Sequence, residues 1–549
     1  MNENLKVQLQ KEGSKMSQLY YNGTILTMDD DCQRVDAIFV NDGRIIKRGT
    51  LEEVSCLKDS DTVLVDLQGK TLMPAFLDGH SHFAGFADSL SQCDLSHAEN
   101  FQDIICLMQE FIKNNKIPKG QWVEGTNYDH NFLKEKKHPD KRVLDQISSE
   151  HPIVLIHASS HMGAANSMAL ERQGINADTK DPEGGRYGRI SGTREPDGYM
   201  EEDAFVEFRN QMPMPEIEEL MKQFQKAQEI YAGYGITTVQ EGMVTEALFP
   251  LLQYAEKGNV LFLDLVGYID LENAAHILRE NVEYTKEYRN HLKIGGYKIF
   301  LDGSPQGRTA WMKEPYEQTT DGYCGYPIEH DEKVYRFILT AMQDGQQLLA
   351  HCNGDAAAEQ YITQFEKAKK EHPELDTCRP VMVHAQLVQE AQLERMKKIG
   401  MLPGFFVAHT YYWGDIHIEN FGSERAGKIS PAGTAGRLHL PFTFHQDSPV
   451  LPPDIFKTIW CAAVRVTKSG TELAQEERVS VYDGLKANTI YAAYQYGEER
   501  EKGSISEGKR ADLIILDRNP LEIPVDEVKE VTVLETIKDG VAVYHRHDH

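Results

Sequence analysis

The feature that most constrains the fold is a long stretch in which short apolar strands alternate with helical segments. Helical patterns such as LENAAHILRENVEYTKEY and DAAAEQYITQFEKAKKEH separate strand-like runs. The predicted strands are 152–158, 236–240, 261–269, 294–302, 346–352 and 380–385. Strand–helix alternation over about 400 residues is typical of a parallel α/β sheet, and a (β/α)8 barrel fits that length.

Both ends of the chain have a different, strand-rich pattern. Asn22-Gly23, Asp42-Gly43 and Asp539-Gly540 lie between strand-like runs, which predicts tight hairpin turns. Chain termini often lie close together, so the two ends are expected to pair. We therefore predict an α/β fold, a distorted (β/α)8 TIM barrel with a small β-sandwich formed from both termini. The predicted ranges are 1–15 for a flexible tail, 16–74 and 491–549 for the sandwich, and 75–490 for the barrel with an insertion near 84–150.

The overall charge limits the classes of partner. The net charge of −27 repels phosphate backbones and anionic lipid, so neither nucleic acid nor a membrane is an expected partner. The eight cysteines are scattered without a C-x-x-C pair, as is typical of reduced thiols. The polar start of the chain lacks the apolar core of a secretory signal. We expect a cytoplasmic protein that acts on a small molecule, with a homodimer as the commonest assembly.

The first chemical signal is the triplet His80-Ser81-His82, which follows the apolar run TLMPAFLDG. Side chains at positions i and i+2 of a strand face the same way, so the two imidazoles share one face. Two such imidazoles supply half of a metal site. An H-x-H triplet also occurs among ordinary surface histidines, so alone it leaves both interpretations open.

Four further residues lie at or near other strand ends. Lys298 lies in GGYKIFLDG, His351 in LLAHC, His384 in VMVHAQ, and Asp447 after HLPFTFHQ. In a barrel these positions would lie towards the carboxyl ends of the strands, where barrel active sites are found. Each has an ordinary alternative: a core histidine, a lysine that reaches the surface, or a turn aspartate. Their combination with the histidine triplet favours a metal site over five separate ordinary positions.

Several segments then carry a family resemblance. They are YNGTILTMD, LMPAFLDGHSH, GITTVQE, GYKIFLDGSPQGRTA, HCNGDAAAEQ, VMVHAQ, DSPVLPPD and KGSISEGKRADLIILDRNP. In order and spacing they resemble the amidohydrolase superfamily, and within it the branch that includes N-substituted formamide deformylases. The resemblance extends from Leu19 to Tyr544.

The resemblance implies a set of metal ligands. One or two divalent ions are expected, zinc first, with iron or manganese as the alternatives. His80 and His82 would bind the more buried ion, and His351 and His384 the more exposed one. Lys298 matches a lysine that carbon dioxide converts to a carbamate, whose two anionic oxygens can bridge two ions.

The resemblance also implies a reaction. Asp447 would contact the first ion and act as general base and acid while metal-activated hydroxide attacks a carbonyl group. The expected substrate is an amide, a formamide or a cyclic amide, cleaved at its C–N bond. The alternatives are an ester or lactone hydrolase, a deaminase, or a catalytically silent barrel used for binding, because a fold does not fix a substrate.

Two further segments predict substrate contacts. His161 and Asn166, in SSHMGAANSMAL, resemble a segment near the substrate in this branch; a helix N-cap region is the alternative. Asp302 and Arg308, in LDGSPQGRTA, are expected either to orient substrate or to tie down their loop.

Three features remain less defined. Tyr411 and Trp413, in the aromatic run 408–415, would either line a pocket for an apolar substrate or simply pack. Gln240-Glu241 stand where relatives often have His then Asp, so specificity is expected to differ if that histidine binds substrate. Glu202 matches a repeated feature of the branch without an assigned role.

Overall fold

The computed structural model describes residues 17–130, 132–157, 161–212, 216–317 and 319–546. It divides into a barrel unit, Met1–Ala84 with Gln225–His549, and an insertion unit, Gly85–Phe224. The tail predicted over residues 1–15 lies outside the described residues. Among the described residues, no helix combines the length and the apolar character needed to cross a membrane.

The barrel unit is built on an eight-stranded sheet in which every hydrogen-bonded pair of neighbours is parallel. The strands follow one another in chain order around the sheet. They are β8 (Phe76–Leu77), β15 (Ile236–Val244), β16 (Asp264–Asp270), β17 (Leu292–Phe300), β18 (Gln347–Cys352), β19 (Val381–His384), β20 (Leu402–Phe405) and β21 (Thr443–Phe444). This topology confirms the predicted barrel class, in which all carboxyl ends meet on one face.

The sheet is distorted where its first and last strands meet. Among the described residues, β8 and β21 form no strand ladder, and Asn488 links them instead. Its backbone carbonyl accepts from the Leu77 amide at 2.8 Å, and its side-chain amide donates to Phe444 O at 3.0 Å. A side chain at Gly79 would lie only 2.6 Å from Phe444 O, so a glycine is needed there. The close approach places the residues after β8 beside those after β21.

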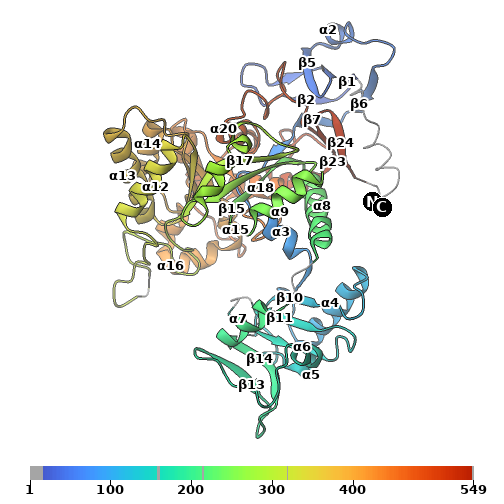
Figure 1. The fold of residues 1–549 in the computed structure, drawn as a ribbon. Coiled ribbons are helices and arrows are strands. Elements are labelled where there is room, and N and C mark those ends of the chain that lie inside the picture. Colours follow the sequence, from blue (N-terminus) through green and yellow to red (C-terminus); the bar gives the residue numbers. More distant parts are fainter. Residues whose placement is uncertain (1–16, 131, 158–160, 213–215, 318, 547–549) are drawn as a thin grey trace. The chain divides into compact units, whose positions relative to one another are not determined.

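Helices connect the strands and cover the outside of the sheet. The helices between strands include α9 (Phe249–Lys257), α10 (Ala275–Glu280), α12 (Asp331–Gln343), α13 (Asp355–Glu371), α14 (Glu390–Ile399) and α16 (Gly414–Gly427). In α13, Ala357, Tyr361 and Phe365 recur every fourth residue and are buried, which is the apolar stripe of an amphipathic helix. Figure 1 shows α12, α13 and α14 side by side along the sheet.

The strands from the two ends of the chain form two sheets. One has the order β5 (Arg44–Gly49), β4 (Ala37–Asn41), β1 (Gln18–Tyr21), β6 (Val63–Asp66). The other has the order β24 (Val541–His545), β23 (Val533–Lys538), β22 (Leu513–Leu516), β7 (Thr71–Pro74), β2 (Thr24–Leu26), β3 (Arg34–Val35). One apolar core combines Ile38 of the first sheet with Leu72 and Leu513 of the second. Both chain ends therefore contribute to a common sandwich.

Two of the three predicted hairpins are present. Asp42-Gly43 joins β4 to β5 and Asp539-Gly540 joins β23 to β24, with positive φ at all four residues, as a type I′ turn requires. The prediction for Asn22-Gly23 is wrong, because β1 and β2 belong to different sheets. There the chain crosses between sheets, and Gly23 passes so close to Lys70 O that a Cβ would lie 2.4 Å from it.

A buried group of charges ties the barrel to the sandwich. Asp264, the first residue of β16, contacts the ammonium groups of Lys502 and Lys538 at 2.6 and 3.1 Å. All three side chains are at most 2% exposed. The two lysines hold the pKa of Asp264 well below its ordinary value against the effect of burial. Removing one charge would leave the others buried without balance, which is strongly destabilising.

The insertion unit has a sheet of its own. Its order is β13 (Gly185–Arg189), β14 (Pro196–Glu202), β12 (Met162–Ala165), β11 (Ile153–His157), β10 (Val123–Tyr128), β9 (Gln92–Asp94). The helices α4 (Phe101–Asn114), α5 (Lys141–Leu144), α6 (Ser167–Arg172) and α7 (Asp203–Asn210) belong to the same unit.

The strand predicted over 152–158 is therefore not a barrel strand, which corrects the sequence analysis. Its observed counterpart, β11, lies parallel to β10, and β10 lies parallel to β9. Helix α4 lies between β9 and β10 in the chain, so this part of the unit repeats the strand–helix–strand pattern of the barrel. The local sequence pattern is the same in both units, and only the pairing distinguishes them.

Candidate metal centre

The segment after β8 is shaped by short hydrogen bonds around Asp78. The Asp78 carboxylate accepts from the backbone amide of His80 at 3.1 Å and from the Ser81 hydroxyl. The same hydroxyl also contacts Gln240 O at 3.1 Å, on the neighbouring strand β15. These bonds fix the backbone so that the histidine triplet follows β8 in one conformation.

Gln240 determines which nitrogen of His80 is available. The Gln240 amide nitrogen donates to Gly79 O and to the Tyr496 hydroxyl at 3.1 and 2.9 Å, so its oxygen must face the other way. That oxygen lies 2.5 Å from His80 Nδ1 and can only accept. His80 therefore carries its proton on Nδ1 and presents an unprotonated Nε2, which is the form that binds a metal. Burial also lowers the pKa of His80 well below its ordinary value.

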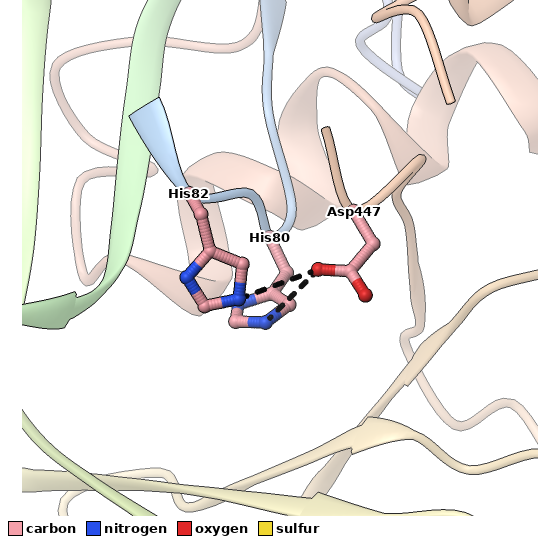
Figure 2. Close-up of side chains that lie close together, drawn as sticks. All are labelled: His80, His82 and Asp447. Atoms are coloured by element: carbon pink, nitrogen blue, oxygen red, sulfur yellow. Dashed lines mark ion pairs between the residues drawn. The ribbon is translucent and has the colours of Figure 1, made fainter. Parts of the chain in front are cut away.

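Asp447 faces both histidines of the triplet. One oxygen, Oδ1, lies 3.7 Å from His80 Nε2 and 3.5 Å from His82 Nε2 (Figure 2). That oxygen is buried and has no hydrogen-bond partner among the described residues. Burial raises the pKa of Asp447, against the opposing effects of His82 and Lys298.

The other nitrogen of His82 faces Glu241. His82 Nδ1 lies 3.6 Å from Glu241 Oε1, and the second oxygen of Glu241 accepts from the Ala84 amide at 2.8 Å. The side chain of His82 remains 30% exposed, whereas His80 is 1% exposed. The site is therefore closed around His80 and open at His82.

Lys298 reaches the same place from β17. Its Nζ lies 3.2 Å from His80 Nε2, and the residue is 1% exposed. Burial lowers the pKa of Lys298 to about 7, although Asp447 and Glu241 oppose that shift. A large part of this amine is therefore uncharged at neutral pH, unlike an ordinary lysine.

Three more histidines continue the cluster across the neighbouring strands. His384 Nε2 lies 3.1 Å from His351 Nδ1, and His384 Nδ1 lies 3.1 Å from His445 Nε2. The ring of His80 is 5.8 Å from that of His384 and 5.4 Å from that of His445. Burial lowers the pKa of His351 to about 3, so its imidazole is neutral at pH 7. The structure thus brings together all six predicted ligands.

The geometry fits a divalent ion. Imidazole nitrogen and carboxylate oxygen are the ligands that Zn²⁺ and similar ions prefer. The separations of 3.5 and 3.7 Å are too long for hydrogen bonds. They are close to the spacing of about 3.4 Å between two ligands of a tetrahedral ion with bonds of about 2.1 Å. Buried polar atoms normally have a hydrogen-bond partner, and Oδ1 of Asp447 has none among the described residues. A bound ion would supply that partner.

Two residues of this cluster were missed from the sequence. His445 stands two positions before Asp447, so the i and i+2 rule that selected His80 and His82 would have selected it too. The sequence marks Gln240 only as a position where relatives often have histidine. Its contact with His80 depends on the pairing of β15 beside β8, which no local pattern reveals.

The loop after β17 is held by Asp302. Its carboxylate accepts from the backbone amides of Asn353, Gly354 and Trp311 at 2.7–2.9 Å. Burial raises the pKa of Asp302 to about 7 despite these bonds. The guanidinium of Arg308 donates to Asn420 Oδ1 at 2.7 Å. Both residues thus tie the loop in place, which is one of the two roles expected for them.

The aromatic residues Tyr411 and Trp413 are partly buried in a packed cluster. Tyr411 lies edge-on to Trp460 at 5.2 Å, and Trp413 lies 6.0 Å from Phe406. Phe406 in turn lies 5.3 Å from the ring of His445. The structure therefore shows packing, and a substrate contact for Tyr411 or Trp413 stays a prediction.

The remaining predicted residues belong to the insertion unit. Asn166 is the N-cap of α6: its oxygen accepts from the Ala169 and Ile153 amides, and its nitrogen donates to His151 O. This is the alternative expected for it, and the side chain is 1% exposed. His161 is exposed and lies 3.1 Å from Glu202, which gives that glutamate a partner.

Known proteins resemble this chain over most of its length. N-substituted formamide deformylase of Arthrobacter pascens is 28% identical, covering 96% of this chain and 98% of that protein. Protein LONG AFTER FAR-RED 3 of Arabidopsis thaliana is 26% identical, covering 96% and 91%. The crystal structure of an uncharacterized metal-dependent hydrolase from Pyrococcus horikoshii OT3 has the same fold, with a TM-score of 0.75, 24% identity, and coverage of 97% and 100%. The Amidohydrolase family matches residues 63–544, and the chain is therefore a member of the Amidohydrolase family.

Proposed function

We propose that this protein is a metal-dependent hydrolase that cleaves the C–N bond of a small amide, formamide or cyclic amide. The observation that carries the proposal is the buried, unpaired oxygen of Asp447 facing the Nε2 atoms of His80 and His82. Membership of the Amidohydrolase family and the likeness to a formamide deformylase support the choice of bond.

The proposed ligands form two groups. His80, His82 and Asp447 would hold a first ion, and His351 and His384 a second. Zinc fits these ligands, with iron and manganese as the alternatives. The bond between His384 and His445 would orient the second group as Gln240 orients the first.

Lys298 is proposed to become a carbamate. The nitrogen of its free amine adds to the carbon of carbon dioxide and releases one proton to solvent, which gives a carbamate whose single negative charge is shared by two oxygens. An ammonium cannot ligate a cation, whereas this group can join the ligands of both ions. The position of Nζ, 3.2 Å from His80 Nε2, supports the proposal because it places the new group beside the first ion's ligands.

When bound, an ion of this class lowers the pKa of a water ligand from about 15.7 to about 7, which makes hydroxide available at neutral pH. Asp447 would accept the proton from water as the oxygen adds to the substrate carbonyl carbon. It would then return that proton to the nitrogen as the C–N bond breaks, releasing an acid and an amine. The partial exposure of His82 leaves this side open to substrate.

The test is hydrolysis by protein purified without chelator. The panel contains N-formyl amines, N-acyl amino acids, cyclic amides and lactones, assayed by release of amine or acid. We expect turnover of at least one amide class, lost in Asp447→Asn and retained in Asp376→Asn, an exposed control. Turnover of lactones alone would contradict the C–N assignment, and absence of turnover across the panel would count against the hydrolase proposal.

A further inference from the structure

The insertion unit contains a second convergence of metal-binding side chains. Asp129 and His130 directly follow β10, and His157 is the last residue of β11. The two strands are parallel neighbours with Tyr128 opposite His157. The carboxyl ends of parallel strands meet at one edge, so these three side chains gather there, as the barrel histidines do at theirs.

The three potential ligand atoms form a compact triangle. His130 Nδ1 lies 3.2 Å from His157 Nε2 and 3.8 Å from Asp129 Oδ1. His157 Nε2 lies 3.5 Å from Asp129 Oδ1. A point equidistant from all three lies about 2.0 Å from each, which matches zinc–nitrogen and zinc–oxygen bonds. A tetrahedral ion would lie slightly to one side of the plane of the triangle.

The three atoms are arranged so that one ion could contact all of them. The two nitrogens lie 3.2 Å apart, and the carboxylate oxygen lies 3.5 and 3.8 Å from them. These separations are close to the spacing of about 3.4 Å between two ligands of a tetrahedral ion with bonds of about 2.1 Å. An ion at the equidistant point would therefore be bound by all three side chains at once.

The surroundings hold the triangle while leaving one side accessible. The ring of His138 lies 4.0 Å from that of His130, and its Nδ1 is 3.1 Å from the Tyr128 hydroxyl. The side chain of His157 is 8% exposed, whereas those of Asp129 and His130 are 25% and 27% exposed. Three protein ligands with one open side are typical of a zinc site whose fourth position takes water or a small ligand.

We propose that the insertion unit binds a divalent ion of the zinc class through Asp129, His130 and His157. This ion is additional to those of the barrel, and its ligands all belong to the insertion unit. The site is independent of the proposed hydrolysis, because none of its ligands is assigned a part in that reaction.

The test is the zinc content of the full chain, stripped with chelator, reloaded with Zn²⁺ and desalted. We expect His130→Ala and Asp129→Asn each to lose one equivalent per chain relative to wild type. His97→Ala, which replaces an exposed histidine of the same unit, should lose none. Loading with Co²⁺ gives a second readout: the visible absorption should fall by the share of one His–carboxylate site in the first two variants only, while the absorption of the barrel site remains.

Two further observations keep the result decisive. The double variant His80→Ala, His82→Ala should lose barrel metal while retaining the equivalent that depends on His130, which separates the two sites. Circular dichroism identifies any variant that fails to fold, and Asp129→Asn keeps the shape of the native residue. Unchanged zinc content in folded Asp129→Asn and His130→Ala would overturn the proposal.

Discussion

Replacing Gln240 with leucine tests how the barrel site selects the metal-binding form of His80. The substitution removes the oxygen that accepts from His80 Nδ1. Gly79 O keeps a bond from Gln495 at 2.8 Å, and the Tyr496 hydroxyl keeps its bond to Asp78 O. The loss therefore falls on His80, whose Nδ1 would be buried without a partner.

The magnitude follows from that single lost contact. A buried, unpaired donor costs about 1–3 kcal/mol in the free energy of unfolding. Loss of a group that orients a metal-binding histidine lowers metal affinity by about 10–100-fold. That factor corresponds to about 1.4–2.8 kcal/mol of binding free energy.

The assay is competition for Zn²⁺ with a chelator of known affinity, alongside chemical denaturation. Gln347→Leu is the matched control: its amide also makes buried hydrogen bonds to Tyr268, Arg379 and Gln495, but at the opposite end of β18 from His351. It should lose stability and keep its metal affinity. Unchanged affinity in Gln240→Leu, or an equal loss in Gln347→Leu, would refute the proposed orienting role.

Three other predictions test separate parts of the account. Asp447→Asn should keep at least one equivalent of metal and lose at least about 100-fold in turnover, since the general base is removed. Metal analysis and steady-state rates check this, and near-normal turnover would remove Asp447 from the mechanism. Asp264→Asn should lower the free energy of unfolding by about 3–5 kcal/mol in urea denaturation at pH 7, because Lys502 stays buried with less opposing charge. The control Glu522→Gln, in an exposed ion pair, should lower it by less than about 1 kcal/mol. Similar losses in the two variants would contradict the assigned burial effect. The pKa of Asp264 is lower in the folded protein than in the unfolded chain, where it is near 4. Its contribution to the free energy of unfolding is therefore present above pH 4 and is lost as the pH falls towards the folded pKa. Wild type should lose stability over that acid range more steeply than Asp264→Asn, and parallel plots of stability against pH would contradict this sign. Asn166→Ala should lower stability by about 1–3 kcal/mol through loss of the α6 cap and the bond to the Ile153 amide, and a change below about 0.5 kcal/mol would contradict its capping role.

The barrel class was predictable because strand–helix alternation is a local property of the sequence. Five of the six predicted strands belong to the barrel, at nearly the expected positions. The sixth, at 152–158, belongs to the insertion unit, where β9, β10 and β11 repeat the same pattern. Which sheet a strand joins depends on long-range pairing, and periodicity does not encode that choice.

The grouping of the proposed metal ligands was predictable from strand ends alone, but their supporting contacts were not. His80, Lys298 and His384 come together because parallel strands place their carboxyl ends on one face. The contact of Gln240 with His80 and the crossing at Gly23 depend on neighbours distant in the sequence. Such contacts follow from packing, which local patterns do not specify.

The ion proposed between His80, His82 and Asp447 can be located directly. The most direct test is an anomalous difference map from crystals of protein purified without chelator, recorded above the absorption edge of the metal found by elemental analysis. We predict a peak about 2.0–2.2 Å from the Nε2 atoms of both histidines and from Asp447 Oδ1. A map without a peak there, from crystals soaked in Zn²⁺, would contradict the claim.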